Sequence, residues 1–86
     1  MKLMSTYDAV NWCRDRDYIT REATKDEIEY FIALNGKPRE ARYNGKLYRF
    51  CDMIYCLVNL GDDAIYGYLV ERRATNGGRI FQYYRI

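Results

Sequence analysis

The chain has 86 residues, of which 49% are hydrophobic, so we expect a single domain with a modest core. Its fourteen basic and twelve acidic residues leave a net charge of +2, which excludes a strongly basic or strongly acidic protein. No apolar run approaches the roughly 18 residues that a membrane helix needs, and the first residues, Met1–Ser5, lack the apolar core of a signal peptide. We therefore expect a cytoplasmic protein without membrane contact.

The charges are unevenly distributed along the chain. Residues 1–36 contain five basic and seven acidic side chains, whereas residues 37–86 contain nine basic and five acidic ones. Any electrostatic contact with nucleic acid is therefore expected in the second half of the chain.

Catalytic and metal chemistry find little support in the sequence. The chain has no histidine for acid–base work and no phosphate-binding glycine loop, so we expect no enzymatic activity. Its three cysteines, Cys13, Cys51 and Cys56, have no C-x-x-C spacing. They predict reduced thiols rather than a disulfide framework or a zinc site, and no cofactor is expected.

Two helices are expected in the N-terminal half. Ser5, followed by Asp8 three residues later, predicts a helix over 5–16. Thr24 and Glu27 form a second capping box, and apolar residues follow at helical spacing up to Asn35-Gly36 and Pro38. Glycine and proline after the last apolar residue end a helix, so we expect this one to cover 25–35.

The middle of the chain allows two interpretations. Residues 38–43 form either a short helix that begins at Pro38, or the strand before a two-residue hairpin turn at Asn44-Gly45. The next apolar residues fall on one face of an α-helix: Leu47, Phe50, Cys51, Ile54, Leu57 and Val58. We therefore expect a helix over 46–59, with a strand as the alternative.

The C-terminal part, residues 65–86, predicts a β-hairpin. Tyr66–Arg73 and Arg79–Ile86 are rich in aromatic and β-branched residues, which suit strands. Thr75-Asn76-Gly77-Gly78 supplies the residues that a tight turn between them needs.

With the expected helices and hairpin in this order, residues 25–86 resemble the winged helix-turn-helix superfamily of DNA-binding domains. The similar segments are Ile28–Pro38, taken as the first helix and its exit, and Gly67–Arg73, Gly77-Gly78-Arg79 and Tyr83–Ile86, taken as the wing. The resemblance implies an α+β fold in which N-terminal helices precede a C-terminal β-hairpin. Residues 1–24 would be an N-terminal helix extension of the same 1–86 domain. The residues alone also allow two helices plus a small antiparallel β-meander.

The resemblance implies a small intracellular transcriptional regulator that binds duplex DNA. In this family the third helix enters the major groove and the wing contacts the adjacent backbone. The nucleic-acid-binding residues would then be Arg39 and Arg42 before the reading helix, Lys46, Tyr48 and Arg49 on it, and Arg72, Arg73, Asn76 and Arg79 at the wing tip.

The alternative is a non-catalytic protein-binding module, such as a small phage- or plasmid-encoded factor that inhibits or redirects a host protein. Tyrosines at the surface are enriched in interfaces. The tyrosines expected there are Tyr43, Tyr48, Tyr55 and Tyr68. On the first helix, Trp12 and Cys13 are expected either to cover the core or to form a homodimer contact.

Overall fold

A computed structural model describes residues 2–86 and shows an antiparallel sheet with two helices. The sheet order is β1-β6-β5-β4-β2, and β3 pairs with the first part of β4. The elements are β1 (Lys2–Ser5), α1 (Thr6–Asp15), β2 (Ile19–Glu22), α2 (Lys25–Asn35), β3 (Ala41–Tyr43), β4 (Lys46–Val58), β5 (Gly67–Arg73) and β6 (Arg79–Arg85).

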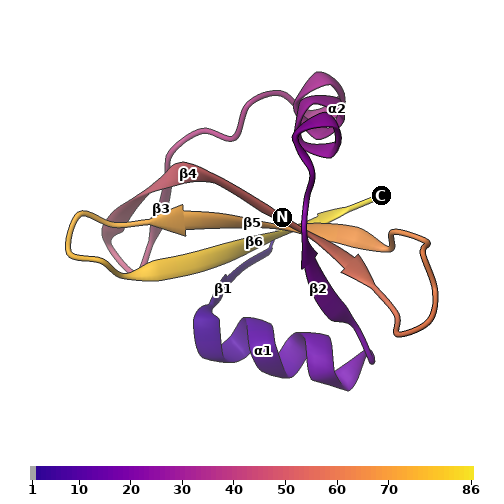
Figure 1. Cartoon of the computed structure of the whole chain (residues 1–86). Helices are drawn as coiled ribbons and strands as arrows, with labels where there is room; N and C mark the ends of the chain where they lie inside the picture. Colours follow the sequence, from indigo (N-terminus) through magenta and orange to yellow (C-terminus); the bar gives the residue numbers. More distant parts are fainter. Residues whose placement is uncertain (1) are drawn as a thin grey trace.

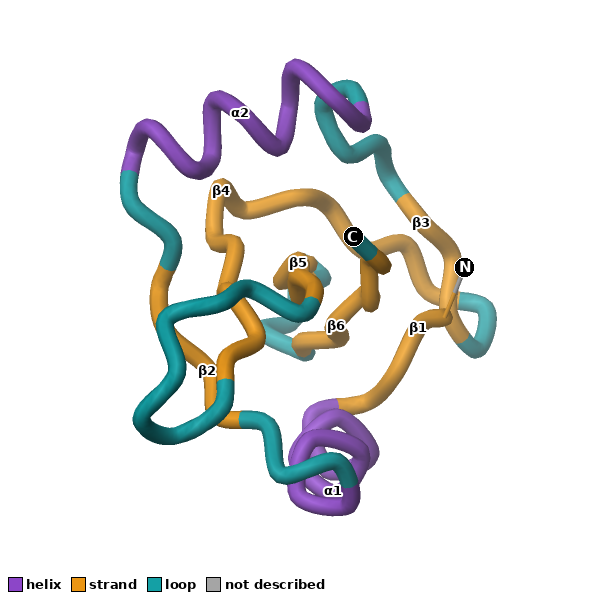
Figure 2. Tube along the Cα trace, turned by 90° about the vertical axis from the view of Figure 1, so that its right-hand side faces the viewer, coloured by secondary structure: helices purple, strands orange, loops and turns teal. Residues whose placement is uncertain are grey.

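The two helices cover opposite faces of the sheet, so the molecule has three layers (Figures 1 and 2). Each face has its own core. On the α2 face the buried residues are Ala23, Phe31, Ile54, Cys56, Val58 and Val70. On the α1 face they are Met4, Ala9, Cys13, Leu57 and Leu69. Within residues 2–86, neither helix is long and apolar enough to cross a membrane.

The structure confirms the first predicted helix. The Ser5 side chain accepts a hydrogen bond from the backbone N–H of Asp8 at 3.1 Å, which satisfies one free donor of the first turn. Ala9 and Cys13, one turn apart, are the buried residues of α1. Trp12 packs on Tyr83 of β6, with ring centroids 4.6 Å apart. Trp12 and Cys13 therefore cover the core of this domain, and the homodimer contact stays a prediction.

The second predicted helix is also confirmed. The capping box is complete, because the Thr24 hydroxyl accepts from Glu27 N and the Glu27 carboxylate accepts from Thr24 N. Phe31 is fully buried and meets the rings of Tyr68 and Tyr84 edge-on, at centroid distances of 5.1 and 4.9 Å. These two contacts attach α2 to the neighbouring strands β5 and β6.

The predicted helix over 46–59 is wrong. This segment is the thirteen-residue strand β4, which pairs with β2, β3 and β5. The short helix over 38–43 is wrong as well, since Ala41–Tyr43 is β3 and Asn44-Gly45 is the hairpin turn to β4. Asn44 and Gly45 both have positive φ angles, 49° and 79°, as such a turn requires.

Two features of β4 explain why its apolar residues looked helical. The sheet is covered on both faces, so apolar side chains occur on both sides of the strand and the two-residue alternation is lost. A β-bulge between Phe50 and Ile54, with Asp52 at φ 64°, also shifts the register. Together they place apolar residues three and four positions apart without any helix.

The expected C-terminal hairpin is present as β5 and β6, but it is not a wing. β5 lies inside the sheet between β4 and β6, and the other edge of β6 pairs with β1. With two helices separated by a strand and six strands in one sheet, the chain does not have the winged helix-turn-helix fold. It is a small α+β domain.

The edge-on contacts of Phe31 give a first prediction. We expect Phe31→Ala to destabilise the fold by about 3–5 kcal/mol, because it leaves a cavity between α2 and the sheet. Leu34→Ala on the same helix is the matched control, since Leu34 is 67% exposed, and it should change stability by less than about 0.5 kcal/mol. Urea unfolding followed by circular dichroism measures both. Equal losses in the two variants would mean that α2 does not dock through Phe31.

A second prediction concerns pH. The Arg21 guanidinium donates two hydrogen bonds to the Glu27 carboxylate, at 2.8 and 2.9 Å. These bonds, followed by the bond from Thr24 N, lower the pKa of Glu27 to about 2. A carboxyl whose pKa is lowered by folding stabilises the native state above its unfolded pKa of about 4.3, and this contribution is lost as the pH falls through its folded pKa.

Thermal unfolding of wild type and Glu27→Gln between pH 7 and pH 2 tests this window. We expect the wild type to be more stable at neutral pH and its advantage to vanish between about pH 4.3 and pH 2. Glu29→Gln, which changes an exposed acid of the same helix, is the control and should follow the wild type. If the wild type stays more stable than Glu27→Gln by the same amount down to pH 2, the charge of the Glu27 carboxylate does not contribute to stability.

Candidate nucleic-acid interface

Three arginines lie directly opposite one another on three neighbouring strands. Arg49 of β4 pairs with Arg73 of β5, and Arg73 pairs with Arg79 of β6. Paired residues of antiparallel strands project from the same face of a sheet. The three side chains therefore form a continuous row, here called the arginine row, at one end of the sheet. All three residues are exposed.

Like charges directly opposite each other destabilise a sheet. The structure compensates this repulsion only in part. Arg49 approaches Glu40 at 3.5 Å, but both side chains are more than half exposed and solvent weakens the pair. Arg73 Nε donates to Glu71 Oε2 at 2.7 Å. Arg79 has no ion pair among the described residues, so the row keeps an excess of positive charge.

Glu71 holds the central arginine in place. Its side chain is fully buried and also accepts a hydrogen bond from the Tyr55 hydroxyl at 3.0 Å and one from the Cys51 thiol at 3.6 Å. Burial opposes ionisation of this carboxyl, but the bonds from Arg73 and Tyr55 outweigh it and lower the pKa of Glu71. An ionised carboxylate in a fixed position therefore orients the Arg73 guanidinium at the surface.

A groove of about 340 Å³ lies beside the row. It separates the start of β4 from the turn between β5 and β6, and it is lined by Lys46, Leu47, Arg49, Ala74, Thr75 and Asn76. Asn76 shapes the turn itself, because its side-chain oxygen accepts a hydrogen bond from Gly78 N at 3.0 Å. The groove thus combines two cations with a polar turn.

The sequence around this end of the sheet is strongly basic. Residues 37–49 contain five basic side chains and one acidic one. The connection between β4 and β5, at the far end of the strands, contains Asp62 and Asp63 and no basic residue. Although the net charge is only +2, the end of the sheet with the arginine row is therefore more basic than the β4–β5 connection at the other end.

Five of the nine predicted nucleic-acid-binding residues meet at this end. They are Lys46, Arg49, Arg73, Asn76 and Arg79, and they come from β4, β5, β6 and the turn between the last two. Arg42 is exposed on β3, and Arg39 is exposed in the connection from α2 to β3. None of these residues lies on a helix, so the expected reading helix does not exist.

Two of the nine residues have structural positions instead. Arg72 is 3% exposed and points to the α2 face, where its guanidinium donates to Gln82 Oε1 at 2.9 and 2.6 Å and to the backbone carbonyl of Arg39. It holds the connection after α2 against the sheet and is not on the surface. Tyr48 is 8% exposed and packs against Tyr43, so it is not a surface residue either.

The expectation about the other tyrosines changes as well. Tyr43, Tyr55 and Tyr68 are only partly exposed, and Tyr55 is tied to Glu71. The tyrosines that are clearly exposed are Tyr7, at 76%, and Tyr30, at 61%. A protein contact through tyrosines would therefore involve the helices rather than the strands.

Sequence reasoning missed the alignment of the three arginines and the acid beneath them. The alignment depends on the strand register, which follows once 46–58 is a strand. The Glu71-Arg72-Arg73 segment contains the relevant signal, because alternate strand residues face opposite sides. Applied to β5, this rule separates Arg72 from Arg73 and places Glu71 beside Arg73.

Comparison of the chain with models of protein families, with curated proteins and with solved structures found no match. The function of the chain is therefore inferred from its own residues, above all from the arginine row and the groove beside it.

Proposed function

We propose that the protein is a non-catalytic nucleic-acid-binding protein whose arginine row contacts the phosphate backbone. The observation that carries the proposal is the cross-strand alignment of Arg49, Arg73 and Arg79. Guanidinium groups pair bidentately with phosphate, and an excess of them on one surface attracts a polyanion.

Neighbouring features support the same assignment. Lys46 and Asn76 extend the row along the adjacent groove. The first turn of α1 also lies beside it, because the Thr6 hydroxyl donates to the backbone carbonyl of Arg79 at 3.5 Å. The positive end of the helix dipole adds to the attraction for phosphate, although Asp8 in the same turn offsets part of it.

The proposed binding does not depend on nucleotide sequence. Both helices pack against the sheet, and the cationic residues lie on strands and turns. Contacts of such residues with phosphates carry no direct sequence information. We also propose that the protein acts inside the cell. Cys13, Cys51 and Cys56 are free thiols, and thiols stay reduced in the cytosol.

Fluorescence anisotropy with a labelled duplex of mixed sequence tests the proposal. We expect binding that weakens steeply with salt, because phosphate contacts release counterions. The triple variant Arg49→Ala/Arg73→Ala/Arg79→Ala should bind at least about tenfold more weakly at low salt and lower the slope of log K against log salt by about 3. The same titration with a single strand shows which form is preferred.

Arg85→Ala is the matched control, because Arg85 is an exposed arginine at the other end of β6. It should bind nearly as well as the wild type. The proposal fails if the wild type does not bind at low salt, or if Arg85→Ala weakens binding as much as the triple variant. Circular dichroism of each variant confirms that the fold is retained.

A protein-binding module is the second candidate function, and one observation favours it. Tyr30 and Leu34 lie one turn apart on the outer side of α2 and are 61% and 67% exposed. An exposed aromatic–aliphatic pair on a helix suits the apolar centre of a small interface. A factor that inhibits or redirects a larger protein would use such a surface.

Pull-down from a nuclease-treated bacterial lysate separates the two candidates. A protein-binding module predicts a stoichiometric protein partner that survives nuclease and is lost with Tyr30→Ser/Leu34→Ser. The arginine-row variant should retain this partner. If only nucleic acid is recovered, or if the α2 variant retains every partner, the second candidate is excluded.

A further inference from the structure

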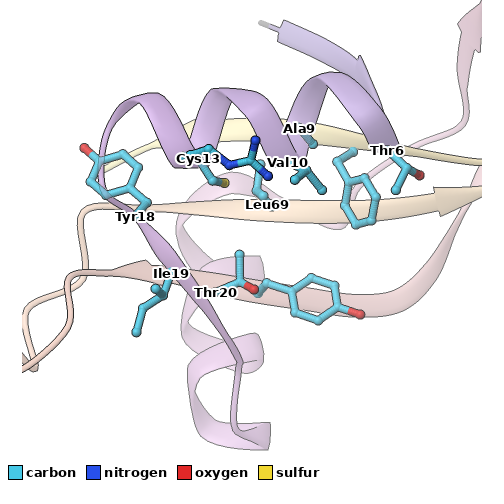
Figure 3. Close-up of a pocket in the computed structure, with 11 residues that line it drawn as sticks. Thr6, Ala9, Val10, Cys13, Tyr18, Ile19, Thr20 and Leu69 are labelled. Atoms are coloured by element: carbon cyan, nitrogen blue, oxygen red, sulfur yellow. The ribbon is translucent and has the colours of Figure 1, made fainter.

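A second hollow lies on the α1 face, apart from the arginine row. It is an open groove of about 580 Å³ between α1 and the strands β2, β4 and β5 (Figure 3). Its lining residues are Thr6, Ala9, Val10, Cys13, Arg14, Tyr18, Ile19, Thr20, Tyr55, Leu69 and Phe81. This volume falls in the range of small-molecule sites.

The groove follows from the way α1 lies on the sheet. The helix contacts β1 and β6 at one side of the sheet, and the part of this face formed by β4 and β2 is left without a covering helix. A tight turn then leads into β2, where Tyr18 N donates to Cys13 O at 2.9 Å. Figure 3 shows Thr20 pointing from β2 toward the helix, across the hollow.

The walls are largely apolar. Leu69 and Phe81 form part of the floor, and Ala9 and Val10 line the helix side. Val10 is 51% exposed, although valine is usually buried. A ligand that covers it would remove apolar surface from water.

One charge lies at the groove. Arg14 is the only charged residue of the lining, and it forms no ion pair with any residue in the part of the chain that the structure describes. The hydroxyls of Thr6 and Thr20 add polar groups to the lining. An apolar site with one unpaired guanidinium is complementary to an apolar molecule with a single negative charge.

The surroundings also set a direction for such a ligand. At the end formed by Tyr55 and Phe81, the Tyr55 hydroxyl already donates to the ionised Glu71. That end therefore offers an aromatic surface whose hydroxyl proton is already taken up, with no free donor for an anionic group. The apolar part of the ligand belongs there, and the anionic group belongs at Arg14.

We propose that the groove between α1, β2 and β4 binds a small amphipathic monoanion, a medium-chain or aromatic carboxylate, whose carboxylate pairs with Arg14. The groove meets the surroundings of the arginine row at Thr6, but the proposal does not depend on the nucleic-acid surface. A second copy of this chain is the other occupant that an apolar groove admits, and the experiment distinguishes it from the carboxylate.

Three ligands of equal chain length test the charge requirement: octanoate, octan-1-ol and octylammonium. Titration of the full chain, followed by amide chemical shifts, should show octanoate binding about tenfold more tightly than octanol, because only octanoate pairs with Arg14. Octylammonium should bind most weakly. The perturbed amides should be those of the lining residues.

Arg14→Gln should reduce octanoate affinity to that of octanol and leave octanol unchanged. Arg16→Gln is the matched control, since Arg16 is the C-cap of the same helix but stacks 4.3 Å above the Trp12 ring, outside the groove. Thr20→Trp, which fills the groove from an exposed position on β2, should abolish binding of both ligands.

The proposal is overturned if octanol or octylammonium binds as tightly as octanoate, or if Arg14→Gln and Arg16→Gln behave alike. Shifts confined to residues outside the groove would also overturn it. Sedimentation at rising protein concentration tests whether a second copy of the chain occupies the groove. A dimer that forms without ligand and is lost in Thr20→Trp would show that a second copy fills the groove instead.

Discussion

The structure depends on the central position of β5, which pairs with a neighbouring strand on each side. β5 pairs with β4 on one side and with β6 along its whole length on the other. Both faces of this strand are covered, so four consecutive residues, Leu69–Arg72, are buried, two of them charged. Burying a charge is costly unless it is paired, and the partners of these two charges organise much of the molecule.

The two charges act on opposite faces. Glu71 points to the α1 face, where Tyr55 and Arg73 supply its hydrogen bonds and fix the middle of the arginine row. Arg72 points to the α2 face, where the side chain of Gln82 and the backbone carbonyl of Arg39 accept hydrogen bonds from its guanidinium. One strand thus secures the cationic surface on one side and the connection from α2 to β3 on the other. The alternation of strand residues produces both results.

Local signals predicted the local structure well. α1, α2 and the β5–β6 hairpin were each marked by capping residues or turn residues close in sequence, such as Ser5, Thr24 and Asn76-Gly77. β1 and β2 were not expected as strands. Each has four residues and exists only because it pairs with a distant segment, β6 or β4. No pattern within four residues reports such pairing.

The error at β4 had a wider effect than the missed edge strands. The helix assigned to 46–59 produced the resemblance to a winged helix-turn-helix, and with it a reading helix that does not exist. The basic residues were still identified, because charge and position along the chain do not depend on the fold. Their mutual arrangement could not be predicted without the register. Arg72 and Arg73 look equivalent in sequence, yet one is buried and the other exposed.

The two faces of the sheet consequently differ in character. On the α2 face, Phe31 fits between aromatic rings and Arg72 is satisfied internally, so this face serves mainly to hold the domain together. On the α1 face, a ten-residue helix leaves part of the sheet open, and the row of like charges persists at a cost in stability. Proteins retain such locally unfavourable features where they bind other molecules. The α1 face, with the arginine row at one end and the groove beside Arg14, is therefore the surface on which we expect the protein to act.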